Sequence, residues 1–362
     1  MKVIDQPRPK VSLNLLGGGI TGAFFHFGVL AALDDHLSRK SVDYDVYVGT
    51  SAGSLVATYC ALGVKPQEVV EAVLKEDRKF FHIKRRDIYR FSLIDWGTDF
   101  GKLLWTLFYW LYMKIEHSED APSFFWVLKD ALPAGFFSMR YYENWISKQF
   151  KNHRLPSFFS ELSKELYIPS YNLDACSRTV FGRPGFQHIS FGKAITASSA
   201  IPIFFEPVSI EDRDFVDGGI GDMAHLDICA SAKAELVIVI NPMVPVRNDL
   251  ESVKIKTVFD EKGKIRDKGF TYVFDQTLRL DLRQRLHQAI HHMGYEYPGV
   301  DVLLIEPDDT DPTMFLFNPM EFESRKQIVQ YAYDLTKKKL RQHSELWSRT
   351  LDKHGITLVG VT

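Results

Sequence analysis

The sequence predicts an α/β fold in which a mostly parallel sheet lies between layers of helices. Near the N-terminus, a short apolar strand, a glycine-containing turn and a helix follow one another twice, at 11–37 and at 44–62. Two such units in succession are typical of parallel strands joined by covering helices. The composition is that of a folded chain, because 45% of the 362 residues are hydrophobic and 25% are charged.

The elements can be assigned in order from apolar runs and their boundaries. The first strand is predicted at 11–16, between Pro9 and a run of glycines, and an apolar helix follows at 23–37. The second strand covers 44–48, and the second helix begins at Ser54 and ends before Gly63. Further strands are predicted at 165–174, 178–182, 236–241 and 302–306, and further helices at 276–293 and from 321 to about 353. Residues 246–270 have the charges and glycines of an exposed loop.

Charge and cysteine content exclude several classes of protein. A net charge of −2 gives no electrostatic case for nucleic acid as a partner. The three cysteines, Cys60, Cys176 and Cys229, are too few and too far apart for a disulfide scaffold, which favours a reducing compartment. No Cys/His cluster has zinc spacing, so we expect neither a metal nor a cofactor. Without a secretory apolar stretch or a long apolar run, we expect a cytoplasmic protein with no spanning helix.

The strongest motif is Gly49-Thr50-Ser51-Ala52-Gly53, a GxSxG sequence between the second strand and the second helix. In a nucleophile elbow the serine occupies a strained turn in this setting, and the glycines let the neighbouring backbone pack closely. The motif therefore predicts Ser51 as a nucleophile supported by Gly49 and Gly53. The alternative is a turn of small residues whose serine only caps the helix.

A second motif, Gly17-Gly18-Gly19-Ile20-Thr21-Gly22, joins the first strand to its helix. Its glycines could leave amide N–H groups pointing at a developing negative charge, as in an oxyanion hole. The same spacing matches the GxGxxG fingerprint of dinucleotide-binding proteins, and a plain tight turn is a third alternative. A dinucleotide site needs an acidic residue at the end of the second strand, where this chain has the GxSxG turn instead.

A third motif, Asp217-Gly218-Gly219, follows a short predicted strand. An aspartate at a strand end could act as the general base for Ser51. Asp-Gly is also the commonest signal for a hairpin turn, so the motif alone leaves both interpretations open.

Taken together and in this order, the three motifs resemble those of the patatin-like phospholipases, a family of lipid acyl hydrolases. The resemblance runs from about 11 to about 245 and includes the segment ASSAIPIFFEPV at 197–208. Residues 315–333 also resemble the C-terminal part of some bacterial members. One position departs from the family pattern, because Thr21 stands where the glycine loop usually carries Arg or Lys.

The resemblance implies a three-layer α/β fold and a serine hydrolase without a histidine relay. Ser51 would be the nucleophile and Asp217 its base, with Gly218 and Gly219 shaping the aspartate turn. The oxyanion hole would comprise Gly17, Gly18, Gly19 and Gly22, with the amides of Gly18 and Gly19 as donors. The substrate would be a fatty-acyl ester of a phospholipid at a membrane surface, and the protein would associate peripherally with that membrane. A homo-oligomer is compatible with the sequence.

This interpretation divides the chain into a catalytic domain at 11–245 and a C-terminal helical extension at 246–362, packed on the same domain. Residues 78–150, rich in aromatic and basic residues, are expected to form a helical insertion or lid.

Other functions stay open at this point. A Ser–His–Asp triad could recruit His287, His291 or His292, although their helical pattern favours a polar helix face. His26 and His225 are expected to be structural. The chain could also be a hydrolase of neutral lipid or other acyl esters, a dinucleotide-binding protein, or a non-catalytic module that binds a membrane or a partner.

The run Leu103–Met113, LLWTLFYWLYM, contains no charge and is too short to span a bilayer. It could be a buried core helix. It could equally be an interfacial lid that places Trp105, Tyr109 and Trp110 at the depth of lipid headgroups. Nearby basic residues would then favour anionic lipid, namely Lys79, Lys84, Arg85, Arg86 and Arg90.

Overall fold

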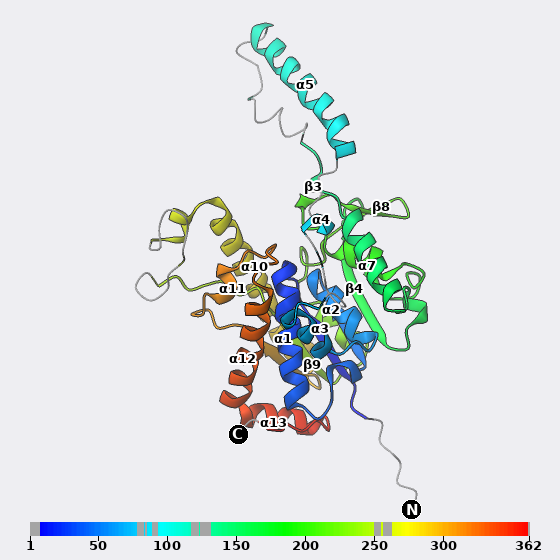
Figure 1. Cartoon of the computed structure of the whole chain (residues 1–362), viewed down its shortest axis with the longest axis vertical. Helices are drawn as coiled ribbons and strands as arrows, with labels where there is room; N and C mark the ends of the chain where they lie inside the picture. The colour runs from blue at the N-terminus through cyan, green and yellow to red at the C-terminus, as the bar shows by residue number, and fades with distance from the viewer. Residues whose placement is uncertain are drawn as a thin grey trace, which may run out of the picture.

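The computed structural model describes residues 8–77, 83, 85–88, 93–116, 123, 132–249, 255 and 263–360. Figure 1 shows a body of strands wrapped by helices, from which one long helix projects. The body contains the sheet and the turns that carry the three motifs.

An eight-stranded sheet runs through the body in the order β10-β9-β1-β2-β4-β8-β7, with β5 paired to β4 off this path. Its strands are β1 (Val11–Leu15), β2 (Val46–Gly49), β4 (Glu165–Asn172), β5 (Ser177–Phe181), β7 (Val208–Ile210), β8 (Arg213–Val216), β9 (Leu236–Ile240) and β10 (Asp301–Ile305). From β10 to β4 all neighbours are parallel, whereas β5, β7 and β8 pair antiparallel. The predicted, mostly parallel sheet is confirmed. Both ends of every predicted strand lie within two residues of the ends of an observed strand.

The central strands are covered on both faces, as β9 shows. Leu236, Ile238 and Ile240 belong to one core cluster, and Val237 and Val239 belong to another on the opposite face. All five side chains are fully buried. A parallel strand covered on both faces appears in the sequence as a continuous apolar run, which explains why these strands were predictable.

Helices form a layer on each face. The first layer comprises α1 (Gly19–His36), α2 (Ala52–Ala61), α3 (Pro66–Leu74), α7 (Arg140–Asn152), α8 (Phe191–Ser198) and α12 (Arg325–Gln342). The second comprises α9 (Leu226–Ser231) and α10 (Phe270–Glu296). Within the first layer α12 lies along α1, and a Cβ at Gly28 would lie 2.4 Å from the carbonyl oxygen of Val329. Only glycine allows the two helices to approach this closely.

The C-terminal part contributes β10 to the sheet and helices to both layers. It also contains α11 (Thr313–Leu316) and α13 (Ser344–Lys353). The single helix predicted from 321 to about 353 is wrong, because the chain turns at His343 and forms two helices. The turn lets Trp347 and Leu351 of α13 bury their side chains in the first core cluster. Neither glycine nor proline marks the break, so no local signal in the sequence reveals it.

The segment between α3 and α7 includes α4 (Arg85–Ile88), α5 (Leu93–Glu116) and β3 (Gly135–Phe137). β3 pairs with β6 (Ile203–Phe205) in a separate two-stranded sheet. In Figure 1, α5 points away from the body. No helix among the described residues combines the length and apolar character needed to cross a membrane. The remaining described elements are the short 3-10 turns η1 (Ser41–Asp43), η3 (Phe159–Glu161) and η4 (Ile265–Lys268).

Candidate active site

Ser51 lies in a tight turn between β2 and α2. Its backbone has φ 52° and ψ −126°, a strained conformation for a residue other than glycine that often marks functional sites. A Cβ at Gly49 would lie 2.6 Å from the carbonyl oxygen of Gly53, and one at Gly53 would lie 2.2 Å from that of Leu15. The predicted strand–turn–helix setting is confirmed. The capping alternative is wrong, because the Ser51 side chain makes no capping hydrogen bond to α2.

The glycine loop lies directly against this turn, since a Cβ at Gly17 would lie 3.2 Å from the Cβ of Ser51. α1 begins at Gly19, earlier than predicted, so Gly22 lies in its first turn. The Gly22 N–H donates to the carbonyl of Gly18 at 2.9 Å, so it is not free to donate to an oxyanion. Within the described residues, no hydrogen bond uses the N–H of Gly18 or Gly19, at the N-terminal end of α1. Such N–H groups and the helix dipole favour an anion there.

Two prolines from distant parts of the chain hold the loop in place. A Cβ at Gly18 would lie 2.5 Å from Pro242, and one at Gly19, where φ is +63°, would lie 2.4 Å from the carbonyl oxygen of Pro319. The Thr21 N–H donates to that same carbonyl at 3.2 Å, and the Thr21 hydroxyl contacts the carbonyl of Gly18 at 3.4 Å. Thr21 therefore supports the loop through neutral hydrogen bonds at the position that departs from the family pattern.

Asp217 follows the end of β8 and is 6% exposed. Its Oδ1 accepts a hydrogen bond from the N–H of Gly219 at 2.8 Å. Its Oδ2 is buried and has no hydrogen-bond partner among the described residues. A Cβ at Gly218 would lie 2.3 Å from the carbonyl oxygen of Pro169, so this turn also requires glycine. One carboxylate oxygen is thus fixed while the other stays available.

The structure brings the carboxyl of Asp217 close to the hydroxyl of Ser51. Burial raises the pKa of Asp217 to about 6, and hydrogen bonding from the Gly219 N–H and the Ser51 hydroxyl limits that rise. The Ser51 interaction is weak in this geometry, because no Ser51–Asp217 hydrogen bond meets standard distance and angle limits. Catalytic hydrogen bonds in unliganded sites are often long and shorten when substrate binds.

Ser198, the last residue of α8, links the serine turn to the aspartate turn. Its Oγ accepts a hydrogen bond from the Ser51 N–H at 3.0 Å, and its carbonyl accepts one from the Gly218 N–H at 3.2 Å. Ser198 belongs to the segment 197–208, which is notable in the sequence only for its family resemblance and for which no role of Ser198 was predicted. Its contacts are to residues far away in the sequence, so no local pattern could have revealed them.

An apolar pocket with a volume of about 50 Å³ opens beside Ser51. Its lining includes Ile20 and Leu55 from the first helical layer, Ile88 from α4 and Met320 from the C-terminal part. No histidine contributes to the described lining. A narrow apolar space next to a hydroxyl nucleophile is suited to a substrate that carries a hydrocarbon chain.

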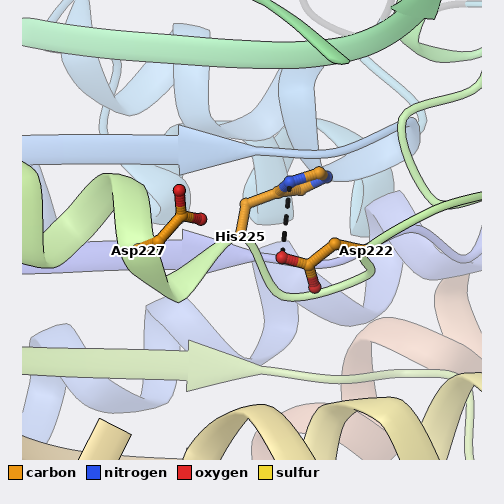
Figure 2. Close-up of side chains that lie close together, drawn as sticks. All are labelled: Asp222, His225 and Asp227. Carbon is orange, nitrogen blue, oxygen red and sulfur yellow. Dashed lines mark ion pairs between the residues drawn. The ribbon is translucent and has the colours of Figure 1, made fainter. Parts of the chain in front are cut away.

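Arg178, Asp222, His225 and Asp227 form a charged network behind the aspartate turn, and Figure 2 shows its two carboxylates on either side of His225. The Arg178 guanidinium lies 2.5 Å from Asp227 Oδ2 and donates to His225 Nδ1 at 3.1 Å. His225 Nε2 donates to the carbonyl of Gly218 at 3.0 Å, next to Asp217. Burial lowers the pKa of His225, so its ring is neutral and accepts from Arg178 on one side while donating on the other.

Asp222, His225 and Asp227 are also the one group of possible metal ligands that lies together within the described residues. Arg178 already supplies a cation to this group, with contacts to both carboxylates and the ring. The arrangement therefore fits an ion-pair network better than a metal centre.

The histidines considered for a triad lie elsewhere. His287 on α10 lies 3.3 Å from Glu306, and His292 lies 3.5 Å from Glu296. His291 packs against Tyr295. His26, as expected, is a buried structural residue, with Nε2 2.7 Å from the carbonyl oxygen of Leu16. In the part of the chain described here, no histidine hydrogen-bonds to Ser51 or to the carboxyl of Asp217, which argues against a triad.

α5 contains the apolar run Leu103–Met113, and its side chains are largely exposed. Trp105 is 74% exposed, Phe108 68% and Tyr109 47%. Trp110 is half-buried, and the ammonium group of Lys114 lies 5.0 Å from the centre of its ring. The alternative of a buried core helix is therefore wrong. The basic residues Lys79, Lys84, Arg85, Arg86 and Arg90 lie outside the part of the chain whose side chains are described.

Comparison with known proteins gives matches of several kinds. A curated relative, "Probable lipid hydrolase 463L" of Invertebrate iridescent virus 6, is 23% identical over 223 residues. That alignment covers 62% of this chain and 64% of the relative, so the chain spans less than two thirds of the relative's length. The crystal structure of VipD from Legionella pneumophila matches at 13% identity and a TM-score of 0.42, covering 93% of this chain and 67% of VipD. The type III effector protein ExoU matches at 13% identity and a TM-score of 0.35, covering 93% of this chain and 53% of ExoU.

The family comparison extends over the region that contains all three motifs. A family model described as patatin-like phospholipase matches residues 15–230, which is more than half of the chain. The matched region begins in β1 and includes the glycine loop, the Ser51 turn and the Asp217 turn. The chain therefore belongs to the patatin-like phospholipase family.

Proposed function

We propose that the protein is a serine acyl hydrolase that cleaves fatty-acyl esters of membrane phospholipids with a Ser51–Asp217 dyad. The observation that carries this proposal is the buried carboxyl of Asp217, which has one fixed and one unpartnered oxygen beside a serine in a strained turn. A pKa of about 6 leaves this carboxyl ionised at neutral pH yet basic enough to accept a proton.

The reaction would begin with transfer of the Ser51 hydroxyl proton to Asp217 as Oγ attacks the ester carbonyl carbon. The N–H groups of Gly18 and Gly19 and the positive end of α1 would stabilise the resulting oxyanion. When the ester C–O bond breaks, the alcohol leaves with the proton from Asp217, and Ser51 carries the acyl group. Water then attacks the acyl carbonyl, passing a proton through Asp217 to Ser51 Oγ, and the fatty acid is released.

Each step uses groups of this chain, and we therefore propose that activity is independent of metal ions. Gly17 packs against Ser51, and Gly49, Gly53 and Gly218 permit the close backbone contacts of the two turns. A Cβ at Gly219 would lie 3.2 Å from Oδ1 of Asp217. Residues 11–245 would supply all catalytic groups. Residues 246–362 would support them, since Pro319 contacts the glycine loop and β10 extends the sheet.

The apolar lining of the pocket favours an acyl chain over a polar substrate. Its volume of about 50 Å³ is far below the roughly 300–1,000 Å³ usual for pockets that enclose a drug-sized ligand. A long chain must therefore displace lining side chains, of which Ile83 and Ile88 lie in the segment leading to α5. A phospholipid is the substrate that we propose, with neutral lipid or another acyl ester as the alternative.

A membrane surface is the setting that the exposed apolar residues support. The chain leaves the pocket at Ile88, enters α5 at Leu93, and returns to the pocket at Met139. At the same rim, the β3–β6 sheet exposes Phe136 and Ile203. We propose that α5 and this rim dock on phospholipid, with Trp105, Tyr109 and Trp110 at headgroup depth. The association would be peripheral and cytoplasmic, in keeping with three unpaired cysteines.

The test is fatty-acid release from mixed phospholipid vesicles in the presence of a calcium chelator. Wild-type protein should be active, and Ser51→Ala and Asp217→Asn should each lower the rate by about a thousandfold or more. Circular dichroism of both variants would control for folding. A wild type that binds these vesicles without hydrolysing them would instead support the alternative of a membrane-binding module on the same fold.

A further inference from the structure

Two adjacent serines at the end of α8 have different surroundings. Ser198 is fully buried, and its Oγ accepts a hydrogen bond from the Ser51 N–H at 3.0 Å. Ser199 is 9% exposed, and its Oγ is buried without any hydrogen-bond partner in the described structure. Its main chain is fully engaged, because its N–H donates to Thr196 at 3.1 Å and its carbonyl accepts from Ile201 at 2.9 Å.

Ser199, whose hydroxyl has no partner among the described residues, is one of the residues that line the pocket beside Ser51. Burying a hydroxyl without a partner destabilises a protein, so most buried hydroxyls are hydrogen-bonded. Neighbouring groups in the lining, such as Ala52, Leu55 and Ile201, offer only apolar side chains. A ligand atom that accepts a hydrogen bond would complete the bonding of Ser199, and an acyl ester carries such an atom in its carbonyl oxygen.

We propose that the Ser199 hydroxyl donates a hydrogen bond to an ester carbonyl oxygen of the bound lipid and thereby helps to select acyl esters. This inference rests on the proposed acyl-ester substrate and adds a contact that the Ser51–Asp217 dyad does not supply. A site that hydrogen-bonds its ligand discriminates against an analogue lacking the acceptor, because its own donor is then left unpaired.

Tyr44 provides a matched control. Its hydroxyl is also buried and unpartnered among the described residues, but it lies just before β2, at the opposite end of that strand from Ser51. Tyr44→Phe and Ser199→Ala each remove one unpaired hydroxyl. Both should leave the unfolding midpoint unchanged or raise it. Ser198→Ala removes a paired hydroxyl and should lower the midpoint.

The experiment measures ligand binding in the Ser51→Ala protein, which binds without turnover. The probes are a short-chain diester phosphatidylcholine below its critical micelle concentration and the diether analogue, which lacks both carbonyl oxygens. Adding Ser199→Ala should raise the Kd for the diester about 3- to 10-fold and leave the Kd for the diether nearly unchanged. Adding Tyr44→Phe should alter neither value.

The contact would be overturned if Ser199→Ala left the Kd for the diester unchanged. It would also be overturned if Ser199→Ala weakened binding of the diester and the diether equally, or if the Ser51→Ala protein bound neither probe. Hydrolysis by protein with Ser51 intact distinguishes the two proposals. If no hydrolysis occurs but Ser199→Ala selectively weakens diester binding, the proposed function fails and the Ser199 contact stands. If hydrolysis occurs and diester binding is insensitive to Ser199, only the contact fails.

Discussion

The turn at Ser51 and the helix α5 differ in how closely other parts of the protein pack against their backbones. In the turn, a Cβ at Gly53 would lie 2.2 Å from a backbone oxygen of β1. In α5, a Cβ at Gly101 would meet no described atom within 4 Å beyond its chain neighbours and the adjacent backbone of its own helix. The turn is held by the packed body, whereas α5 leaves Trp105, Phe108 and Tyr109 exposed. Chemistry is therefore expected where packing is tightest, and membrane contact where packing is weakest.

The largest expected difference between the two regions concerns their glycines. Gly53→Ala should destabilise the fold by on the order of 3–5 kcal/mol, because the new methyl group overlaps the backbone of β1. Gly101→Ala should instead stabilise α5 by about 0.5–1 kcal/mol, since alanine is the better helix former. Urea denaturation and helical circular dichroism measure the two effects. Equal stabilities of both variants would contradict the contrast.

The second prediction uses the buried carboxyl of Asp217, whose folded pKa of about 6 lies above its usual value of 3.8. As the pH rises from about 4 through 6, this group ionises, and the free energy of unfolding falls because the charge is buried in the folded state. Above pH 6 the free energy of unfolding falls no further from this cause. Asp217→Asn should therefore be more stable than wild type at pH 8, by up to about 3 kcal/mol. The difference should vanish below pH 4.

The same ionisation should appear in catalysis. Since Asp217 must be ionised to accept a proton, kcat/KM of the wild type should rise through about pH 6 and then level off. Denaturation curves measured between pH 4 and pH 8 test the stability effect, and rates on a soluble ester test the catalytic effect. If the difference in stability between Asp217→Asn and wild type did not change with pH, ionisation of the Asp217 carboxyl would not destabilise the folded protein, and the prediction would be wrong.

The smallest expected effect lies in α5 and concerns binding rather than folding. Trp105→Glu combined with Tyr109→Glu should weaken partitioning onto phospholipid vesicles by about 2 kcal/mol, or about 30-fold. Leu346→Glu is the matched control, because Leu346 is 59% exposed on α13, away from the pocket. Vesicle co-sedimentation measures binding, and circular dichroism checks folding. Equal binding by the double variant and the control would argue against docking through α5.

Much of the fold was predictable because its signals are local. The strands β2 and β9 are apolar runs covered on both faces, and the Ser51 turn carries the glycines that its geometry requires. The extent of the glycine loop was not predictable, because α1 begins within the glycine run. The break at His343 was also missed, because it depends on tertiary packing. It is set by burial of Trp347 and Leu351, with no helix-breaking residue to reveal it.

The sequence by itself determined the α/β class, the order of the three motifs and the residue types that can perform acyl transfer. Only the tertiary structure decided which groups meet. Ser198 is 147 residues from Ser51 and Arg178 is 47 residues from His225, yet each pair is hydrogen-bonded. The structure also decided that Ser199 lines the pocket without a partner for its hydroxyl among the described residues, and that Trp105 and Phe108 of α5 are exposed. Local patterns encode backbone conformation, whereas proximity, burial and the resulting shift in the pKa of Asp217 arise only when distant segments pack together.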